Sequence, residues 1–383
     1  MADTPADPNT GAAGTELRTL QSLRALGHDV DAIWSDELGR RIAHGNRHLL
    51  LELPRAYKRA AVEAARRRAY DVMHVNQPHG YAAARAMRRV SPRTVFVHRS
   101  HGFEMNLEET LQPWRAKFGN DNRGILRRVA SYALAALLAR HGRAIAREAD
   151  GHIVSSSLDA TFLRERLGVA AGRIAVIAQA APESFLRLPA SPLDARRLRR
   201  VLFVGQLTFS KAPMIVGAAM RALAERHADL QFTWVCSRAH HDEVRGLAPA
   251  NIELLDWMPA ARLIEVYDAH GLFLFPSFFE GFGKVFLEAM SRGLCVIASN
   301  VGGARDVIEN GVSGLLVPPG DAAAIASAAE SLLADPSRAA AMATEAARVS
   351  RTYTWDRVAR ETATFYEVIR TQVAAQGSVR RSG

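Results

Sequence analysis

The sequence predicts an α/β protein with two domains, each built around a parallel β-sheet. Short apolar runs alternate with helix-forming segments along most of the chain, and this alternation is typical of parallel sheets. The clearest unit spans residues 271–298, where an apolar run, a glycine-rich turn, a helix-forming segment and a second apolar run follow one another. At 383 residues the chain is long enough for two domains, each with its own core.

The composition is that of a soluble globular protein, with 48% hydrophobic residues and a mean hydropathy of −0.06. The first ten residues carry no apolar stretch of the kind found in a secretory leader, and the apolar run at residues 132–139 is too short to span a bilayer. Cys236 and Cys295 both lie in strand-like runs and indicate no disulfide framework. We therefore expect a cytoplasmic location.

The net charge of +10 is concentrated in the N-terminal half of the chain. Residues 1–190 hold 28 Lys and Arg against 19 Asp and Glu, whereas residues 191–383 hold 21 against 20. One interpretation is an arginine-rich composition on solvated helix faces. The other is an anionic partner, such as a membrane surface at the inner face, a lipid phosphate or an acidic glycan. No nucleic acid is expected as a partner, since no recognition motif or aromatic platform is present.

The N-terminal segment lacks the buried strand with which a nucleotide-binding α/β domain opens. The chain enters a glycine turn at Gly11 and continues into an amphipathic helix with leucines at 17, 20, 23 and 26. A strand is then expected at residues 29–34. We expect that the natural start codon lies upstream and that the first strand is missing from this chain.

Further strands of the first sheet are expected at residues 49–53, 72–75 and 94–97. The last of these runs into Arg99-Ser100-His101-Gly102, and a side chain at the carboxyl end of a parallel strand faces the ligand crevice of an open sheet. His101 is therefore a candidate site residue, the alternative being a loop histidine without a role. His98, three residues earlier, is expected inside the strand with a structural role.

Residues 105–150 form a long, arginine-rich and mostly helical insertion. Its arginines either dock an anionic acceptor or a membrane, or are solvated while an apolar stripe packs in the core. After the next strand, at residues 151–154, Ser156 and Asp159 have the spacing of a helix cap. The best linker is residues 188–200, and the expected domains are 1–190, 191–352 and a C-terminal helix and tail, 353–383, that crosses back to the first domain.

The second domain carries the stretch with the most chemical information. Gly281 and Gly283 let the backbone approach a ligand closely, and the first amides of the following helix attract anions, a diphosphate above all. Glu280 and Glu288 flank this turn with seven residues between them. Because a carboxylate would repel phosphate, both acids are expected to accept hydrogen bonds from sugar and ribose hydroxyls. Alternatively, they are a favourable acid at a helix start and an ordinary surface glutamate.

This stretch resembles the donor-site signature of the family 4 glycosyltransferases, retaining nucleotide-sugar enzymes with a GT-B fold. The resemblance rests on Glu280 and Glu288, on Gly281-Phe282-Gly283 between them, and on the downstream turn Val301-Gly302-Gly303. It extends in weaker form over most of the chain. It implies two Rossmann-like parallel-sheet domains that face a central cleft, with the donor held by the second domain and the acceptor mainly by the first.

The resemblance also implies a role for each matching residue. The expected catalytic residues are His101, Glu280 and Lys211, with His101 and Glu280 on the donor sugar. The expected donor-binding residues are Gly11, Gln206, Lys211, Gly281, Phe282, Gly283 and Glu288, the last on the ribose. The chain departs from the family pattern at Gln206, which replaces a phosphate-binding arginine, at the glycine turn around Gly11, and at residues 177–181, where the family commonly has Pro-Asn-Gly.

The predicted function is transfer of a sugar from a nucleotide diphosphate sugar to a glycan, lipid-linked or small-molecule acceptor, with retention of anomeric configuration, in bacterial cell-envelope glycan synthesis. The alternatives are a catalytically silent nucleotide-sugar-binding protein, or another GT-B enzyme such as an epimerase or a phosphorylase. We expect no cofactor and no metal, because amides and cations can neutralise the diphosphate. His240-His241-Asp242 does not indicate a metal site, since adjacent histidines rarely reach one ion.

Overall fold

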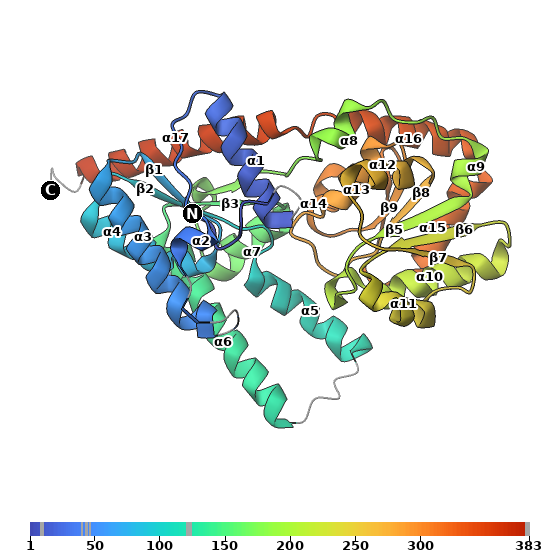
Figure 1. The fold of residues 1–383 in the computed structure, drawn as a ribbon, viewed down its shortest axis with the longest axis horizontal. Helices are drawn as coiled ribbons and strands as arrows, with labels where there is room; N and C mark the ends of the chain where they lie inside the picture. Colours follow the sequence, from blue (N-terminus) through green and yellow to red (C-terminus); the bar gives the residue numbers. More distant parts are fainter. Residues whose placement is uncertain (8–10, 40, 43–44, 46, 120–124, 380–383) are drawn as a thin grey trace. The chain divides into compact units, whose positions relative to one another are not determined.

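The computed structural model describes residues 1–383 apart from 8–10, 40, 43–44, 46, 120–124 and 380–383 (Figure 1). The chain divides into two compact units. The first holds residues 1–109, 118–179 and 355–383, and the second holds residues 110–117 and 180–354. Residues 180–190, which we assigned to the first domain, therefore group with the second, and the C-terminal helix groups with the first.

The first unit is built on a parallel sheet with the strand order β1-β2-β3-β4. Its strands are β1 (Val72–Val75), β2 (Val95–Arg99), β3 (Gly151–Val154) and β4 (Ile174–Val176). Its helices are α1 (Gly11–Ala25), α2 (Ser35–Leu38), α3 (Leu53–Arg67), α4 (Tyr81–Val90), α6 (Ile125–Glu148), α7 (Ser157–Leu167) and α17 (Trp355–Val379), with a π-helical turn at His48–Glu52. Helix α5 (Glu104–Phe118) begins in this unit, and its residues 110–117 group with the second.

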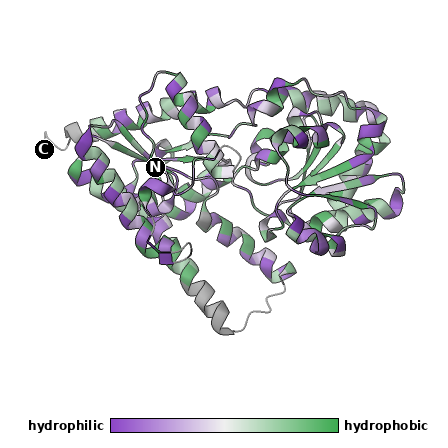
Figure 2. Ribbon diagram, in the orientation of Figure 1, coloured by the Kyte–Doolittle hydropathy of each residue, from purple (hydrophilic) through white to green (hydrophobic). Residues whose placement is uncertain are grey.

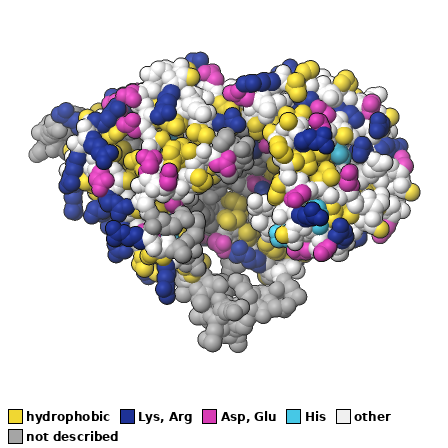
Figure 3. Space-filling model, in the orientation of Figure 1, with side chains coloured by type: hydrophobic (Ala, Val, Ile, Leu, Met, Phe, Trp, Pro, Cys, Tyr) yellow, Lys and Arg dark blue, Asp and Glu magenta, His cyan; other side chains and the backbone are white. Residues whose placement is uncertain are grey.

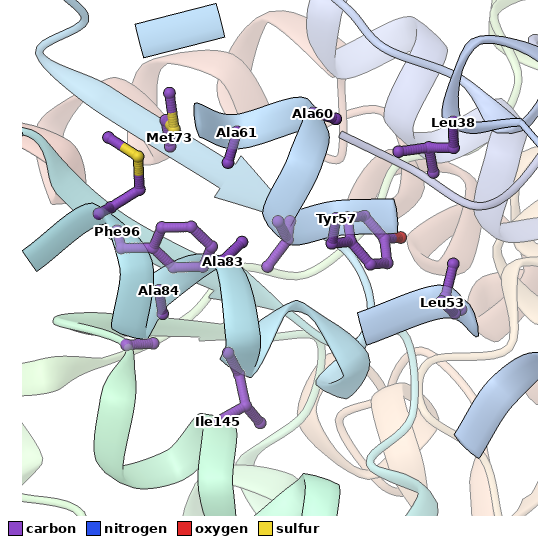
Figure 4. Packing of buried hydrophobic residues seen from close by; sticks show 13 residues of the cluster. Leu38, Leu53, Tyr57, Ala60, Ala61, Met73, Ala83, Ala84, Phe96 and Ile145 are labelled. Atoms are coloured by element: carbon purple, nitrogen blue, oxygen red, sulfur yellow. The ribbon is translucent and has the colours of Figure 1, made fainter. Parts of the chain in front are cut away.

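Successive side chains of β1 point to opposite faces of the first sheet and so define its layers. Met73 and Val75 pack with Tyr57 of α3 and Met87 of α4 in one apolar cluster (Figure 4). His74 points the other way, where its Nδ1 lies 2.6 Å from the hydroxyl of Tyr366 in α17. Helices α3 and α4 thus cover one face, and α17, against which α1 packs, covers the other (Figure 1).

The second unit is built on a parallel sheet with the order β10-β9-β8-β5-β6-β7. Its strands are β5 (Arg200–Val204), β6 (Gln231–Val235), β7 (Ile252–Leu255), β8 (Leu272–Phe275), β9 (Cys295–Ser299) and β10 (Leu315–Val317). Its helices are α8 (Glu183–Arg187), α9 (Ala195–Leu198), α10 (Pro213–Arg226), α11 (His241–Leu247), α12 (Ala260–Asp268), α13 (Lys284–Ser291), α14 (Gly302–Val307), α15 (Ala322–Ala334) and α16 (Pro336–Ser350). The central strands are apolar on both faces, as expected for a parallel sheet covered by helices (Figure 2).

Two of the expected strands are wrong. Residues 49–53 form the π-helical turn and the start of α3, because a short apolar run fits a buried helix as well as a strand and Pro54 favours a helix start. Residues 29–34 belong to no strand. The other strands lie within one or two residues of their predicted positions, and Ser156 caps α7 by accepting a hydrogen bond from the amide of Asp159.

Buried arginines hold the segment that leads into the second unit. Arg292, at the end of α13, is 2% exposed and donates to the backbone carbonyls of Leu188 and Pro189, 3.0 Å away in each case. Its guanidinium also forms a two-pronged pair with Asp268 at 2.8 and 2.9 Å. Arg197 likewise donates to several carbonyls, among them that of Arg292 at 3.0 Å. The predicted linker at residues 188–200 is thus held by hydrogen bonds to the rest of the second unit.

We predict that Arg292→Ala destabilises the protein by about 3 kcal/mol or more, because it leaves buried carbonyls without a hydrogen-bond donor and Asp268 without its ion-pair partner. Arg199→Ala is the control, since Arg199 is half exposed and pairs with an exposed Asp229; it should cost less than about 1 kcal/mol. The measurement is the midpoint of urea unfolding. Equal shifts for the two variants would contradict the role given to Arg292.

Candidate functional site

The second sheet has a topological switch point between β5 and β8. From β5 the chain proceeds outward through β6 and β7, and it then returns to β8, which pairs with the other edge of β5. Loops that leave the two strands therefore diverge at their carboxyl ends, and ligands of open α/β sheets bind in the crevice formed there. The loop after β5 carries Gln206 and Lys211, and the loop after β8 carries Glu280.

Lys211 and Glu280 meet at this switch point. The Nζ atom of Lys211 forms an ion pair with Oε1 of Glu280, and the hydroxyl of Ser277 donates to the same oxygen over 2.8 Å. Glu280 is 8% exposed, whereas the Lys211 side chain is 27% exposed. The two loops are also joined by a backbone bond from Phe278 N to Ser210 O of 2.8 Å. Two residues to which the sequence assigned separate roles thus form one pair.

The start of α14, the Gly302-Gly303 turn, fits against the Glu280 loop because both residues are glycines. Gly302 has a φ of 55°, and a Cβ atom there would lie 2.5 Å from the carbonyl oxygen of Glu280. A Cβ atom on Gly303 would lie 2.2 Å from the ring of Phe282, and the Gly303 amide donates to Phe282 O at 3.1 Å. Close backbone packing between these two loops is therefore the physical reason for the glycine pair.

Phe282 is a core residue by its side chain. It is 1% exposed and packs on Phe286, with the ring centroids 5.4 Å apart. Gly283 follows with a φ of 90°, over the ring of Phe275, and precedes α13. Of residues 281–283, only the backbone is thus available to a ligand, together with the amino end of α13, whose partial positive charge favours anions.

Glu288 lies in the second turn of α13 and is 8% exposed. The buried hydroxyl of Tyr267 donates to its Oε2 at 3.2 Å. Burial raises the pKa of Glu288, and the nearby Lys284 and the Tyr267 hydroxyl oppose that rise. The side chain is therefore held in place by a buried partner, which makes it a defined hydrogen-bond acceptor for a hydroxyl and not a mobile surface glutamate.

In the first unit, His101 follows β2 and is held by two side chains that the sequence did not single out. Its Nε2 lies 2.7 Å from Oε1 of Glu16 in α1, and the amide of Gln179 lies 3.3 Å from its Nδ1. Gln179 is itself fixed by Thr15 at 3.2 Å and by Ser155 at 3.2 Å. His98, as predicted, lies inside β2 and is fully buried.

Glu16 is the anionic centre of this group. Burial by itself would raise the pKa of Glu16, but the charges and hydrogen bonds of His74 and His101 hold it well below its usual value. A carboxylate at this position fixes the ring of His101 and its tautomer. The one sequence signal for Gln179 was the departure from the family pattern at residues 177–181, and Glu16 had none.

Other predicted site residues are placed less distinctively. Gly11 is the first residue of α1, is exposed, and would accept a Cβ atom with nothing within 4 Å. Gln206 is exposed after β5. Gly11 lies at a helix start and Gln206 follows the carboxyl end of a strand. Packing does not explain why either position holds the residue that it does. Their roles stay predictions.

Among the described residues, no three His, Cys, Asp or Glu side chains are placed to hold a metal ion. Within the same residues, no helix combines the length and apolar character needed to cross a bilayer.

Solved structures resemble the chain over almost its whole length. A sucrose-phosphate synthase from Thermosynechococcus elongatus superposes with a TM-score of 0.74 at 21% identity and covers 98% of each chain. The HepE protein of Anabaena, solved with UDP, superposes with a TM-score of 0.62 at 20% identity, over 99% of this chain and 98% of its own. These likenesses show the GT-B fold, with its two parallel-sheet Rossmann-like domains.

Family models match both units. One described as Glycosyltransferase Family 4 matches residues 11–185, and one described as Glycosyl transferases group 1 matches residues 199–335. The chain belongs to the family 4 glycosyltransferases. A D-inositol 3-phosphate glycosyltransferase of Rhodococcus jostii is 31% identical over 55% of this chain and 51% of its own length. A glycogen synthase of Mycobacterium tuberculosis is 30% identical over 58% and 55%. The chain thus spans about half the length of the curated relatives it matches.

We predict that Gly302→Ala lowers stability by about 1–3 kcal/mol more than Gly311→Ala, because only the first adds an atom that collides with backbone. Both glycines have positive φ, 55° and 84°, and Gly311 has nothing within 4 Å of the added atom. The pair therefore separates collision from backbone strain. Thermal unfolding is the measurement, and equal losses would show that the glycine pair serves conformation alone.

Proposed function

We propose that this protein transfers a sugar from a nucleotide diphosphate sugar to an acceptor, with retention of anomeric configuration. The observation that carries the proposal is the Lys211–Glu280 pair at the switch point, next to the glycine-bounded start of α13. A cation, the amino end of a helix and a buried carboxylate in one loop system suit a ligand that combines a diphosphate with hydroxyl groups.

In this mechanism the chain acts by positioning and by charge. The first amides of α13 and the ammonium of Lys211 stabilise the negative charge that develops on the leaving diphosphate. Glu280 orients Lys211 and accepts hydrogen bonds from the sugar, and Glu288 accepts from the ribose. Because no carboxylate among the described residues stands out as a covalent nucleophile, the incoming hydroxyl attacks from the face that the diphosphate leaves, and the departing phosphate takes the proton.

His101 serves the same reaction from the first unit. Since Glu16 and Gln179 both engage its ring, the imidazole is a fixed donor and acceptor whose position depends on α1 and on the segment after β4. UDP-glucose is the first donor to try, since HepE was also solved with it. The acceptor is not fixed, because the names of the relatives point to chemically different acceptors.

The first experiment measures thermal stabilisation by UDP-, GDP-, ADP- and TDP-sugars, together with nucleotide release. We expect one nucleotide class to stabilise the protein, by about 2.7 kcal/mol at a hundredfold excess over Kd. Glu288→Gln should weaken that binding, and Glu280→Gln should slow transfer about 100-fold or more. Glu225→Gln, an exposed change on α10, is the control.

The outcomes separate the proposal from its rivals. Binding without nucleotide release by the unaltered protein would favour a catalytically silent binder. A lack of stabilisation by every donor would contradict the assigned donor site. Release that Glu280→Gln leaves unchanged would contradict the catalytic role of the Lys211–Glu280 pair while leaving the donor site intact.

We also propose that the first unit docks on an anionic membrane surface at the inner face, where a lipid-linked acceptor of envelope glycan synthesis would be met. Helices α3 and α4 pack together, and their exposed basic side chains gather on one side of the unit (Figure 3). These are Arg55, Lys58, Arg59, Arg66, Arg67, Arg85, Arg88 and Arg89. Glu63 is the one acid of the two helices, and Glu148 of α6 pairs with Arg85 and Arg88, so the face keeps a net positive charge.

Binding to vesicles that contain anionic lipid should therefore be salt-sensitive. Each basic side chain near such a surface contributes about 1 kcal/mol, so Arg66→Gln with Arg67→Gln should weaken binding roughly tenfold or more. The control is Arg245→Gln with Arg262→Gln, two exposed arginines of the second unit. Co-sedimentation is the measurement. Equal binding by both double variants, or no binding at low salt, would dismiss the membrane role.

A further inference from the structure

Helix α5 places a tryptophan against the loop that carries Glu280. Residues 110–117 of this helix group with the second unit. There the indole of Trp114 lies flat on the ring of Phe278, with the ring centroids 4.6 Å apart and the ring planes inclined by 9°. Phe278 is fully buried, and Leu111, one helical turn before Trp114, is 3% exposed. This end of α5 is therefore packed into the second unit.

A glycine of another loop makes room for the indole. Gly320, between β10 and α15, has a φ of 75°, and a Cβ atom there would lie 2.4 Å from Cζ3 of Trp114 and 3.3 Å from Cε1 of Phe278. A side chain at this position would collide with the indole and push it off the phenyl ring. Glycine at 320 therefore serves the stack as well as the turn.

Phe278 connects this stack to the turn that carries Lys211. Phe209 also packs on Phe278, with the ring centroids 5.4 Å apart, and it is the first residue of the 3₁₀ turn Phe209–Lys211. The amide of Phe278 donates to Ser210 O of the same turn at 2.8 Å. One phenyl ring thus contacts both Trp114 of α5 and the turn with the lysine.

The Lys211 turn depends on its surroundings. Ala212, the next residue, has a φ of 52°, in the left-handed region that costs free energy for a residue with a Cβ atom. Backbone of this kind persists only where neighbouring groups hold it. Lys211 and Glu280, which form the ion pair, each lie two residues from a ring of the stack, Phe209 and Phe278 respectively.

We propose that Trp114 is a positioning residue of the donor site. By stacking on Phe278 it holds the Glu280 loop and the Lys211 turn together, so that the ammonium and the carboxylate keep one arrangement. A displacement of about 1 Å in such groups is enough to slow an enzymatic reaction strongly. The inference rests on the proposed function, because this ion pair is the one assigned to the diphosphate and the sugar of the donor.

The first test measures the reactivity of the Lys211 amine in the protein without donor. A lysine amine reacts when it is unprotonated and accessible, and the ion pair with Glu280 opposes both. The chain has four lysines, so each can be followed by mass spectrometry of its own peptide after brief treatment with acetic anhydride. Lys58, exposed on α3, is the internal reference. Lys117 is unsuitable as a reference, because its ammonium lies over the Trp114 ring.

We expect Trp114→Ala to raise the labelling rate of Lys211, relative to Lys58, about three- to tenfold, the factor that corresponds to the loss of one aromatic pair. Trp114→Phe keeps a ring on Phe278 and should leave the rate within about twofold of that of the unaltered protein. The control is Gln112→Ala, an exposed change on the same helix, which should have no effect.

Gly320→Ala reaches the same stack from the other loop and keeps the indole in the protein. Its added methyl group collides with the ring, so the labelling of Lys211 should also rise. In the Trp114→Ala background the collision is absent, and the glycine change should add little. This variant provides the test if Trp114→Ala folds poorly.

The second test is nucleotide release from the UDP-, GDP-, ADP- and TDP-sugars. With the sugar that the unaltered protein uses, Trp114→Ala should lower kcat about tenfold or more and change KM less, because the pair acts on the leaving diphosphate. Trp114→Phe should restore kcat. A role in packing alone would lower the midpoint of urea unfolding but leave kcat and Lys211 labelling as they are.

Three outcomes would overturn the proposal. Lys211 labelling that neither Trp114→Ala nor Gly320→Ala changes would show that the stack does not hold the ion pair, whether or not the protein transfers sugar. Faster labelling with a normal kcat would contradict a positioning role in the reaction. No release by the unaltered protein would overturn the proposed function and the role of Trp114 in transfer, while labelling would still decide whether Trp114 holds the pair.

Discussion

The candidate donor site depends on the close contact between the Gly302-Gly303 turn and the Glu280 loop. A Cβ atom on either glycine would lie within 2.5 Å of an atom of Glu280 or Phe282, so no other residue lets the two loops approach so closely. The contact fixes the backbone that carries Glu280, and Ser277 orients its carboxylate. The Glu280 carboxylate can then hold the ammonium of Lys211 at one fixed position. A site that recognises a diphosphate requires such a fixed cation.

The second unit was largely predictable because its site is encoded locally. Glu280, the glycines and Glu288 lie within one strand–turn–helix segment, so their spacing along the chain fixes their spacing in space. The pairing of Lys211 with Glu280 was harder to see, because it depends on β5 lying beside β8, which no local pattern shows. The buried state of Phe282 was also missed, since the sequence does not tell a ligand-facing ring from one packed on Phe286.

The first unit was predicted less well, and the reasons are physical. Glu16, His101 and Gln179 come from α1, the end of β2 and the segment after β4, and only the fold brings them together. In the sequence, an acid in an amphipathic helix or a glutamine in a loop does not by itself indicate a functional site. The strand expected at 49–53 failed because apolar residues before a proline also start helices, and helix α3 buries Leu53 and Tyr57 in the core.

His74 links the His101 group to the core of the first unit. Its Nδ1 lies 2.6 Å from the hydroxyl of Tyr366 in α17, and its Nε2 lies 3.6 Å from Oε2 of Glu16 in α1. Glu16 in turn contacts the ring of His101 over 2.7 Å. Because α1 packs on α17, the position of the His101 ring depends on how these two helices pack, and not on the site residues alone.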